Sequence, residues 1–329
     1  MSKRFDNKKI LYILAGLIVL LAVTFLVKIP REKSTIREIL IELDTAKVNK
    51  IAVLPRAAEG DPFEFIKRDG KWLIQQKNIV SAPEKGVVEN ILLEVQNIRP
   101  KSLEAVDKTK WKEFNLTDSL AIRVKFLNEK GDDLADLMIG KFTYNPVNNQ
   151  YASSNPYNIQ GTSYVRLYGE KKVYGVEGFL SMSFSGKFKD YRDKSFLKLN
   201  KKDVTKISFV LPPDSSFMLN RKDSVWYAGE HVPDSTAIAN YLNAISYMNG
   251  SDFRDSFKPV INPSCELLIE GNNLLNLSVK CYKGDNENEY ILNSSLNPEV
   301  YFYSTRDGIF DKLFKSKKYF LTKPAKKVR

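Results

Sequence analysis

The side chains that most often perform catalysis or bind metals are scarce in this chain. Its 329 residues include one histidine, His231, and two cysteines, Cys265 and Cys281. One imidazole excludes any site with several histidine ligands, and two thiols alone cannot form a four-ligand zinc centre. The sequence also lacks a phosphate-binding glycine-rich loop and a dinucleotide fingerprint. It therefore predicts no metal site and no cofactor.

Two arrangements could still support hydrolysis. His231 is the only base available for a Ser-His-Asp triad, but it stands in a predicted loop, where a histidine is usually not catalytic. The neighbouring carboxylates Asp132 and Asp133 fall at a predicted hairpin turn, which favours Asp for its own geometry. Carboxylates brought together from distant positions stay open, because the sequence does not show separation in space. We predict a non-enzymatic protein without catalytic residues and keep a carboxylate-dependent hydrolase as an alternative.

The two cysteines lie on neighbouring predicted strands. A turn centred on Asn272 and Asn273 brings Cys265 and Cys281 to nearly opposite positions of one hairpin. In an oxidising compartment such a pair can form a disulfide. The alternative is two reduced thiols that pack as small apolar side chains. Both hypotheses stay open.

A transmembrane helix is predicted near the N-terminus. Residues 10–27 form an uncharged run of eighteen residues, which gives a helix of about 27 Å, close to the roughly 30 Å hydrocarbon core of a bilayer. No small-residue cleavage site follows the run, and a short basic N-terminus stays cytoplasmic. The expected location is the inner (cytoplasmic) membrane of a bacterium, single-pass, with membrane lipid around residues 10–27 and a periplasmic C-terminal domain.

The remainder of the chain contains an internal repeat. Two pairs of segments match in order: 47–54 with 202–211, and 63–72 with 217–226. Their apolar and polar residues alternate, as in half-buried strands. The second pair ends at Trp72 and Trp226, and in both copies the tryptophan follows two basic residues, an acidic residue and two spacers.

A helix is predicted after each pair of strands. Two sets of apolar residues recur with the spacing of one helix face: Val87, Val88, Ile91, Leu92, Val95 and Ile98, then Ala237, Ile238, Tyr241, Leu242, Ile245 and Met248. Each residue of the second set lies 150 positions after its counterpart, as Pro233 does after Pro83. The expected fold class is α+β: an N-terminal transmembrane helix, then two related units of mainly antiparallel strands with one packed amphipathic helix each.

The predicted domain limits follow from these patterns. They are a cytoplasmic N-terminus (1–9), a transmembrane helix (10–27), a linker (28–45), a first α+β unit (46–199), a second α+β unit (200–322) and a basic tail (323–329).

Composition and charge limit the kind of partner. Hydrophobic residues make up 43% of the chain, with 19 Phe and 16 Tyr, so a folded core is expected. The net charge is +12; Lys3, Arg4, Asp6, Lys8 and Lys9 contribute +3 of it, which leaves +9 after the predicted span. This surplus either aids solubility alone or attracts an anionic glycan or lipid headgroup. No basic run longer than two residues interleaves with aromatic residues, so no nucleic-acid partner is predicted.

Four Asp-Ser/Thr triplets have two interpretations. They resemble the O-glycosylation acceptors of Bacteroides-type bacteria, and the same residues are favoured in turns and helix caps. The triplets begin at Asp44, Asp118, Asp223 and Asp234.

Several short segments also carry a family resemblance. They are the strand with Trp72, the amphipathic helix after it, Phe114-Asn115-Leu116, Leu137-Met138-Ile139-Gly140, Tyr164-Val165-Arg166, Val173-Tyr174-Gly175-Val176 and Tyr191-Arg192-Asp193-Lys194. With them the chain resembles a bacterial family known only as domain of unknown function 4340 (DUF4340), in which Tyr-Gly is usual at positions 114 and 115. The resemblance covers about residues 46–210 and, more weakly, the second unit. It implies a single-span envelope protein encoded near export-type ABC transporters, and it supplies no catalytic residue.

Three functions are consistent with these observations. The leading prediction is a membrane-anchored periplasmic protein that serves as an accessory or scaffold subunit of an envelope complex, such as an ABC-type export system, with an integral-membrane or periplasmic protein as partner. The second is a binding module for an anionic glycan or lipid headgroup. The third is the carboxylate-dependent hydrolase.

Overall fold

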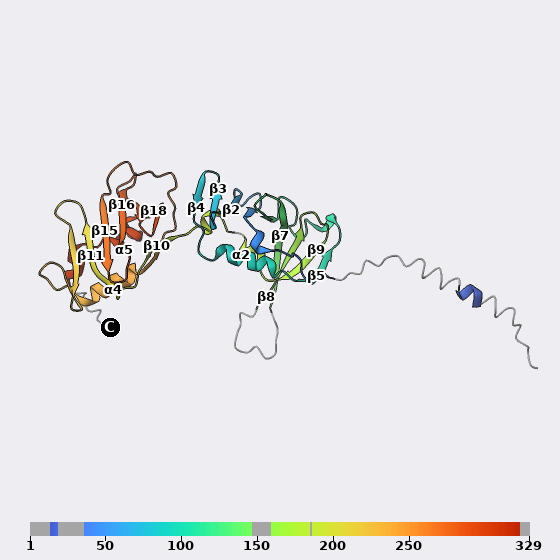
Figure 1. Ribbon diagram of the computed structural model, residues 1–329, viewed down its shortest axis with the longest axis horizontal. Helices are drawn as coiled ribbons and strands as arrows, with labels where there is room; N and C mark the ends of the chain where they lie inside the picture. Colours follow the sequence, from blue (N-terminus) through green and yellow to red (C-terminus); the bar gives the residue numbers. More distant parts are fainter. Residues whose placement is uncertain (1–13, 19–35, 147–158, 185, 323–329) are drawn as a thin grey trace, which may run out of the picture.

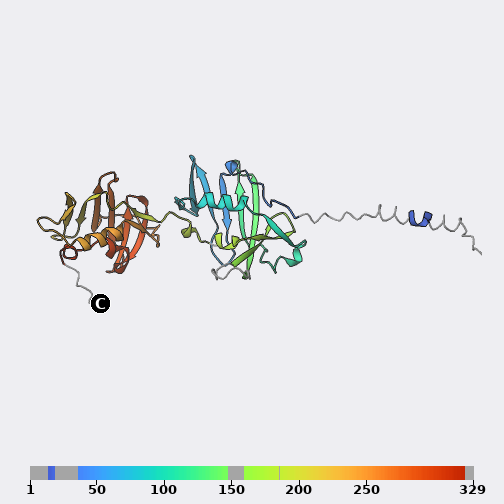
Figure 2. The same ribbon diagram turned by 90° about the horizontal axis from the view of Figure 1, so that it is seen from below.

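The computed structural model describes residues 14–18, 36–146, 159–184 and 186–322 (Figure 1). Two antiparallel sheets follow one another along the chain, and each has its own hydrophobic core. The views in Figures 1 and 2 show them as two bodies joined through a narrow waist. We call the body with the first sheet the first unit and the body with the second sheet the second unit.

The first unit contains a nine-stranded sheet with the order β4-β3-β2-β1-β6-β7-β8-β9-β5. Its elements are η1 (Thr45–Lys47), β1 (Lys50–Leu54), β2 (Phe63–Arg68), β3 (Lys71–Gln76), β4 (Ile79–Ser81), α2 (Val87–Gln96), β5 (Pro100–Ala105), η2 (Lys108–Lys110), β6 (Ile122–Leu127), β7 (Asp133–Pro146), β8 (Ile159–Leu167), β9 (Val173–Glu177), α3 (Leu180–Ser183) and η3 (Phe188–Asp190). All of its strand pairings in the described residues are antiparallel.

The second unit contains a seven-stranded sheet with the order β13-β12-β11-β15-β16-β17-β18, and a small sheet of β10 and β14. Its elements are β10 (Ser195–Lys198), β11 (Val204–Val210), β12 (Phe217–Lys222), β13 (Val225–Tyr227), α4 (Ser235–Ile245), β14 (Tyr247–Asn249), β15 (Cys265–Gly271), β16 (Leu277–Lys283), β17 (Glu289–Ser294), β18 (Asn297–Thr305), η4 (Arg306–Phe310), α5 (Asp311–Leu313) and α6 (Lys317–Leu321).

The two main helices form where the apolar spacing predicts them, except that Ile98 lies beyond the end of α2 and Met248 lies in β14. Helix α2 buries Val88, Ile91, Leu92 and Val95, and α4 buries Ala237, Ile238, Tyr241, Leu242 and Ile245. Both helices pack against the inner face of the sheet in their own unit, because this stripe of side chains leaves water only there. Asp234 starts α4, and its carboxylate accepts a hydrogen bond from the Ala237 N–H at 2.9 Å.

Each core begins earlier in the chain than the repeated strands suggest. Residues 40–43, inside the predicted linker, contribute Leu40, Ile41 and Leu43 to the first core. Phe196 and Leu197 of β10, together with Leu199, enter the second core. The Leu40 N–H donates to the Ile98 carbonyl at 3.3 Å, and the Leu199 N–H donates to the Ser246 carbonyl at 2.9 Å. In both units the leading segment therefore lies beside the residues that follow the main helix.

Each core is closed by an aromatic residue from the end of its unit. The Glu84 N–H, after Pro83, donates to the Tyr191 carbonyl, and the Asp234 N–H, after Pro233, donates to the Phe320 carbonyl, both at 2.8 Å. The Tyr191 ring packs on Phe63 and Phe65. The Phe320 ring packs on Phe209, Phe217 and Tyr241. In both units, therefore, the residue after the matched proline, Pro83 or Pro233, is hydrogen-bonded to the aromatic residue that closes the core.

The waist between the units is held by an ion pair between the buried Arg192 and the more exposed Asp255. Arg192 is only 3% exposed and donates two hydrogen bonds, at 2.8 and 2.6 Å, to the carboxylate of Asp255. Its guanidinium lies 3.8 Å from the ring centre of Phe253. The carbonyl of Asp193 also accepts a hydrogen bond from the Asn297 side chain at 3.2 Å. The connection is therefore a packed junction.

The expected fold class is wrong about its N-terminal helix and its balance of elements. In the described ranges no helix is long and apolar enough to cross a membrane, and antiparallel strands outweigh helices. Within the predicted span 10–27 only residues 14–18 are described, as five helical residues; the rest of that prediction lies outside the described residues.

Candidate functional site: a cationic cavity on the second unit

The two sheets present corresponding outer faces, on the side away from α2 or α4. The pairing of β1 with β6 places Ile51 opposite Phe126, and that of β11 with β15 places Ile207 opposite Ile269. Ile122 then pairs with Ile139 as Cys265 pairs with Cys281. The next residue on each outer face is Gly140 in the first unit and Tyr282 in the second. These two positions are structurally equivalent.

In the first unit, residues 106–121 lie across the outer face; we call them the covering segment. A Cβ atom on Gly140 would lie 2.0 Å from the Phe114 carbonyl oxygen, which accepts a hydrogen bond from the Lys141 N–H at 3.0 Å. The segment turns at Asn115, whose φ of 56° is left-handed, a conformation that Gly and Asn adopt more readily than other residues. The segment can lie directly on β7 because Gly140 has no side chain.

The covering segment completes a second, smaller core. Its buried residues are Ala105, Phe114, Leu116, Ala121, Met138 and Val173. Arg166 is 1% exposed beside this core; its Nε donates to the Leu116 carbonyl at 3.0 Å, and its guanidinium lies 3.7 Å from the Trp111 ring centre. Burial lowers the pKa of Arg166 from its ordinary value. The donors of this arginine are used to hold the segment in place.

In the second unit the corresponding face is only partly covered. The Phe257 ring packs against Tyr282 and Tyr301, at 5.3 and 5.2 Å between ring centres. The Arg254 guanidinium lies 4.3 Å from the Tyr303 ring centre. A cavity of about 570 Å³ remains beside these rings, and we call it the cationic cavity. Its lining residues are Arg254, Ser256, Phe257, Lys258, Lys283, Gly284, Asp285, Glu289, Ile291 and Tyr303.

Three positive charges line the cationic cavity: Arg254, Lys258 and Lys283. None of the three forms a salt bridge with another residue in the part of the chain that the structure describes. The lining also holds two carboxylates, and that of Glu289 accepts a hydrogen bond from the Tyr303 hydroxyl at 2.9 Å. Hydrogen bonds from Asn286 and Tyr303 lower the pKa of Glu289. Three cations against two carboxylates leave the cavity with a positive balance.

This arrangement suits binding of a negatively charged group. A guanidinium that lies flat over a tyrosine ring keeps its in-plane N–H donors available for a carboxylate, phosphate or sulfate. Lys258 and Lys283 add point charges, and the rings of Phe257 and Tyr303 offer apolar contact. The carboxylates can accept hydrogen bonds from ligand hydroxyl groups.

Sequence reasoning did not find the cationic cavity. Arg254 and Lys258 precede β15, whereas Lys283 ends β16. The three residues therefore share no periodic pattern, and only the sheet register brings their segments together. The one available signal is the short Arg254–Lys258 stretch, in which two basic residues flank Phe257.

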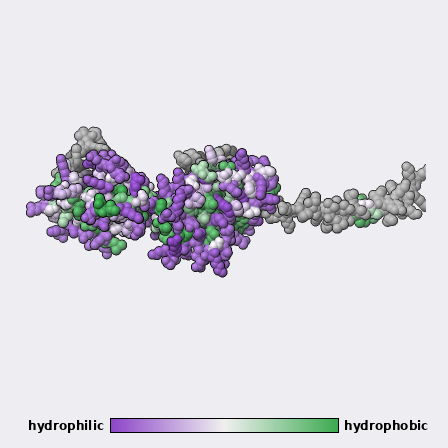
Figure 3. Space-filling model, turned by 90° about the horizontal axis from the view of Figure 1, so that it is seen from above, coloured by the Kyte–Doolittle hydropathy of each residue, from purple (hydrophilic) through white to green (hydrophobic). Residues whose placement is uncertain are grey.

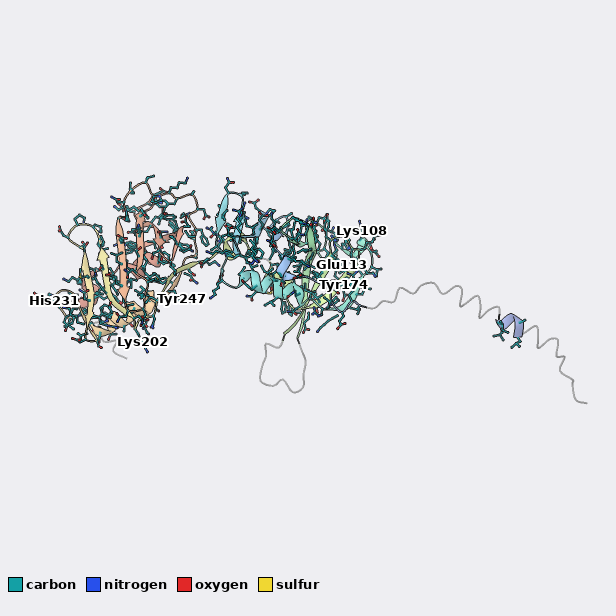
Figure 4. The ribbon with its side chains drawn as sticks, in the orientation of Figure 1. Lys108, Glu113, Tyr174, Lys202, His231 and Tyr247 are labelled. Atoms are coloured by element: carbon teal, nitrogen blue, oxygen red, sulfur yellow. The ribbon has the colours of Figure 1, made fainter. Side chains whose placement is uncertain are left out.

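The residues that the sequence singled out for hydrolysis lie apart from the cavity lining. His231 is exposed in a turn, where its carbonyl accepts a hydrogen bond from the Ala228 N–H at 2.8 Å, and Figure 4 shows it at the end of the second unit far from the first unit. Asp132 lies in the turn before β7, and Asp133 pairs with Lys125 at 3.0 Å. The described residues contain no group of three or more His, Cys, Asp or Glu side chains that could hold a metal ion.

The residues that mark the repeat have structural positions. Trp72 and Trp226 each pack, partly buried, on the core of their own unit. Pro83 pairs with Arg192 in an isolated bridge, and Pro233 lines an apolar cavity together with Trp226.

The four Asp-Ser/Thr triplets lie in turns and caps. Asp44 accepts a hydrogen bond from the Ala46 N–H, and Asp234 caps α4. Asp118 lies 3.6 Å from Arg166. Asp223 and Ser224 have φ values of 49° and 71° in the turn between β12 and β13.

Cys265 and Cys281 face each other across β15 and β16 as direct register partners. Both thiols are buried and unbonded, with Cys265 8% and Cys281 0% exposed. Contact with the Cys281 thiol, helped by Ser264 and Lys283, lowers the pKa of Cys265 to about 7. Contact with Cys265 and burial raise the pKa of Cys281. The sequence predicted that Cys265 and Cys281 lie nearly opposite each other, and in the structure they are direct register partners.

The fold defines a class of protein with two related antiparallel units, each with one main helix on its inner face. The chain belongs to the family described as domain of unknown function (DUF4340), whose model matches residues 82–264. The resemblance expected from the short motifs is therefore confirmed. Neither a curated protein nor a solved structure matches the chain significantly.

The family motifs meet in two places. Phe114, Gly140, Tyr164 and Arg166 lie where the covering segment contacts the sheet; the Phe114 and Tyr164 ring centres are 4.7 Å apart. The Tyr191–Lys194 motif forms the junction between the units. The matched range includes both places, whereas the strand with Trp72 lies before it.

Proposed function

We propose that this chain is a non-enzymatic binding protein whose second unit holds an anionic glycan in the cationic cavity. The observation that supports the proposal is the set of three cations without salt bridges, Arg254, Lys258 and Lys283, around a cavity with aromatic walls. On the outer face of the first unit, Arg166 has donors occupied by backbone carbonyls of the chain itself. A partly covered face, with three cations that form no salt bridge to a described residue, is suited to a ligand from outside the chain.

A glycan fits the cavity better than a bare anion. Its acidic group can bind the Arg254 guanidinium, its hydroxyls can donate to Glu289, and its ring can lie against Phe257. Charge-assisted hydrogen bonds contribute about 1.5–3 kcal/mol each when well formed. Loss of one such contact therefore weakens binding by about tenfold or more.

The test is calorimetric titration of the folded chain with a uronic-acid oligosaccharide at low and high salt. The variant R254A/K258A/K283A is expected to bind at least about tenfold more weakly. A matched control, K85A/K112A/K130A, removes the same charge from three exposed lysines of the first unit and is expected to keep its affinity. Equal loss in both variants, or no binding by the wild type at low salt, would overturn the proposal.

Two further outcomes distinguish the alternatives. Preference for vesicles with an anionic phospholipid over the oligosaccharide would contradict a glycan as ligand and support a lipid headgroup. Release of new reducing ends from the oligosaccharide would contradict a non-enzymatic role and support the hydrolase.

A second proposal is an accessory or scaffold subunit of an envelope complex, such as an ABC-type export system. It is favoured by an apolar cavity of about 410 Å³ between α4 and the edge strand β13, lined by Trp226, Val232 and Leu242 among others. On another face, seen from above in Figure 3, hydrophobic side chains also gather near the middle of the second unit. Affinity purification from native membranes should recover an integral-membrane or periplasmic partner in stoichiometric amount. Recovery of the chain alone would contradict this role.

A further inference from the structure

The cysteine pair lies directly beside the cationic cavity on the same strand. Cys281 is followed by Tyr282 and Lys283, which lie at the cavity. The partner thiol, Cys265, begins β15 on the neighbouring strand. Because register partners on adjacent antiparallel strands have Cβ atoms about 4.5–5.5 Å apart, only a small movement is needed to reach disulfide distance.

The surroundings of the two thiols are unequal. The Ser264 N–H donates to the Cys281 carbonyl at 2.8 Å, and the Ser264 hydroxyl lies 3.9 Å from the Cys281 sulfur. Cys281 is fully enclosed, whereas Cys265 is 8% exposed and near the Lys283 charge. A positive charge favours the thiolate, which is the reactive form of a cysteine. Cys265 is therefore both the more accessible and the more easily ionised member.

We propose that Cys265 and Cys281 are a redox-active pair, in which Cys265 attacks a disulfide-bearing oxidant and Cys281 resolves the mixed disulfide. This inference does not depend on the proposed glycan ligand. It assigns different roles to two residues that the sequence treats alike.

The exchange balances in two steps. The Cys265 thiolate attacks one sulfur of an oxidised thiol such as glutathione disulfide, forms a mixed disulfide and releases one glutathione thiolate. The Cys281 thiol then loses its proton to the released thiolate and attacks the Cys265 sulfur, which expels the second glutathione thiolate. The protein dithiol loses two electrons and two protons, and the oxidant is reduced to two thiols.

The bond would connect the strands on which the cavity depends. It would join the ends of the β15–β16 hairpin immediately before Tyr282 and Lys283. A cross-link of this kind restricts the unfolded chain and raises the denaturant concentration at which the hairpin opens.

The test is incubation of the full chain with glutathione disulfide, followed by intact mass measurement and thiol counting under denaturing conditions. The wild type should lose both titratable thiols, retain no glutathione and show a higher urea midpoint. C281S should retain one glutathione on Cys265, and C265S should remain largely unmodified under the same conditions. The double variant C265S/C281S, as control, should show no shift of its midpoint with the oxidant.

Two results would overturn the inference. One is a wild type that keeps both thiols after equilibration with the oxidant, a measurement that does not depend on the folding of any variant. The other is equal glutathione retention by C265S and C281S, which would remove the assigned roles.

Discussion

The outer faces of the two units share one strand arrangement but are covered in different ways. In the first unit the covering segment lies on β7, where Gly140 leaves room for the Phe114 carbonyl. In the second unit the equivalent position holds Tyr282, whose ring packs on Phe257. The tyrosine occupies the space that the covering segment uses in the first unit, so the polar residues beside it stay accessible. A single side chain thus accompanies the change from a closed core to an open cavity.

One arginine on each outer face shows the same difference between a closed and an open surface. Arg166 lies 3.7 Å from a Trp111 ring centre and donates to backbone carbonyls, whereas Arg254 lies 4.3 Å from a Tyr303 ring centre with no salt bridge to a described residue. Stacking on an aromatic ring is common to both. Burial determines whether the remaining donors serve the fold or are available to a ligand.

The largest expected effect concerns this arginine pair. R166M leaves the Leu116 and Tyr168 carbonyls without their donor and should lower the free energy of unfolding by about 3 kcal/mol. R254M removes an arginine that forms no salt bridge with a described residue, so the free energy of unfolding should fall by less than about 0.5 kcal/mol. Urea unfolding of both variants measures the difference. Equal losses would contradict the assignment of a structural role to Arg166 alone.

The next effect tests the small residue under the covering segment. G140A places a Cβ atom against the Phe114 carbonyl, which is backbone and cannot move alone, so the free energy of unfolding should fall by about 2 kcal/mol. G169A is the matched control, because a Cβ atom there meets nothing within 4 Å, and its stability should change by less than about 0.5 kcal/mol. Urea unfolding of the two variants side by side makes the measurement; a G140A protein as stable as G169A would show that the segment is not in contact.

The sequence predicted some of these structural features and missed others. Helical spacing located α2 and α4 because each buries a full apolar stripe. The leading segments at Leu40 and Phe196 were missed because each is too short for a periodic signal. The cationic cavity was missed for a different reason: its cations come from separate segments, and only register aligns them. The apolar run at 10–27 predicted a span from its length and lack of charge, and no spanning helix is found in the described residues.

The two aromatic residues that close the cores, Tyr191 and Phe320, are followed by different residues, and only Tyr191 leads into the junction between the units. Tyr191 is followed by Arg192, which pairs with Asp255 of the second unit, whereas Phe320 is followed by Leu321. A double-mutant cycle of R192M and D255N should give a coupling energy of about 2 kcal/mol, since the arginine is almost fully buried. The exposed pair Lys77–Asp61, treated as K77M and D61N, should give less than about 0.5 kcal/mol. A coupling at Arg192 as small as at Lys77 would indicate that the junction is held by packing instead.

The smallest expected effect lies at the turn of the covering segment. Asn115 has a φ of 56°, where an L-residue with a Cβ atom and no compensating polar group loses about 1 kcal/mol. N115A should therefore lower the free energy of unfolding by about 1 kcal/mol, whereas N115G, which adopts a positive φ without strain, should change it by less than about 0.5 kcal/mol. Thermal and urea unfolding of the two variants can resolve this difference. If N115A proved as stable as N115G, the left-handed turn would not be needed to bring Phe114 and Leu116 onto the sheet, and the closed face of the first unit would have to be explained by Gly140 and Arg166 alone.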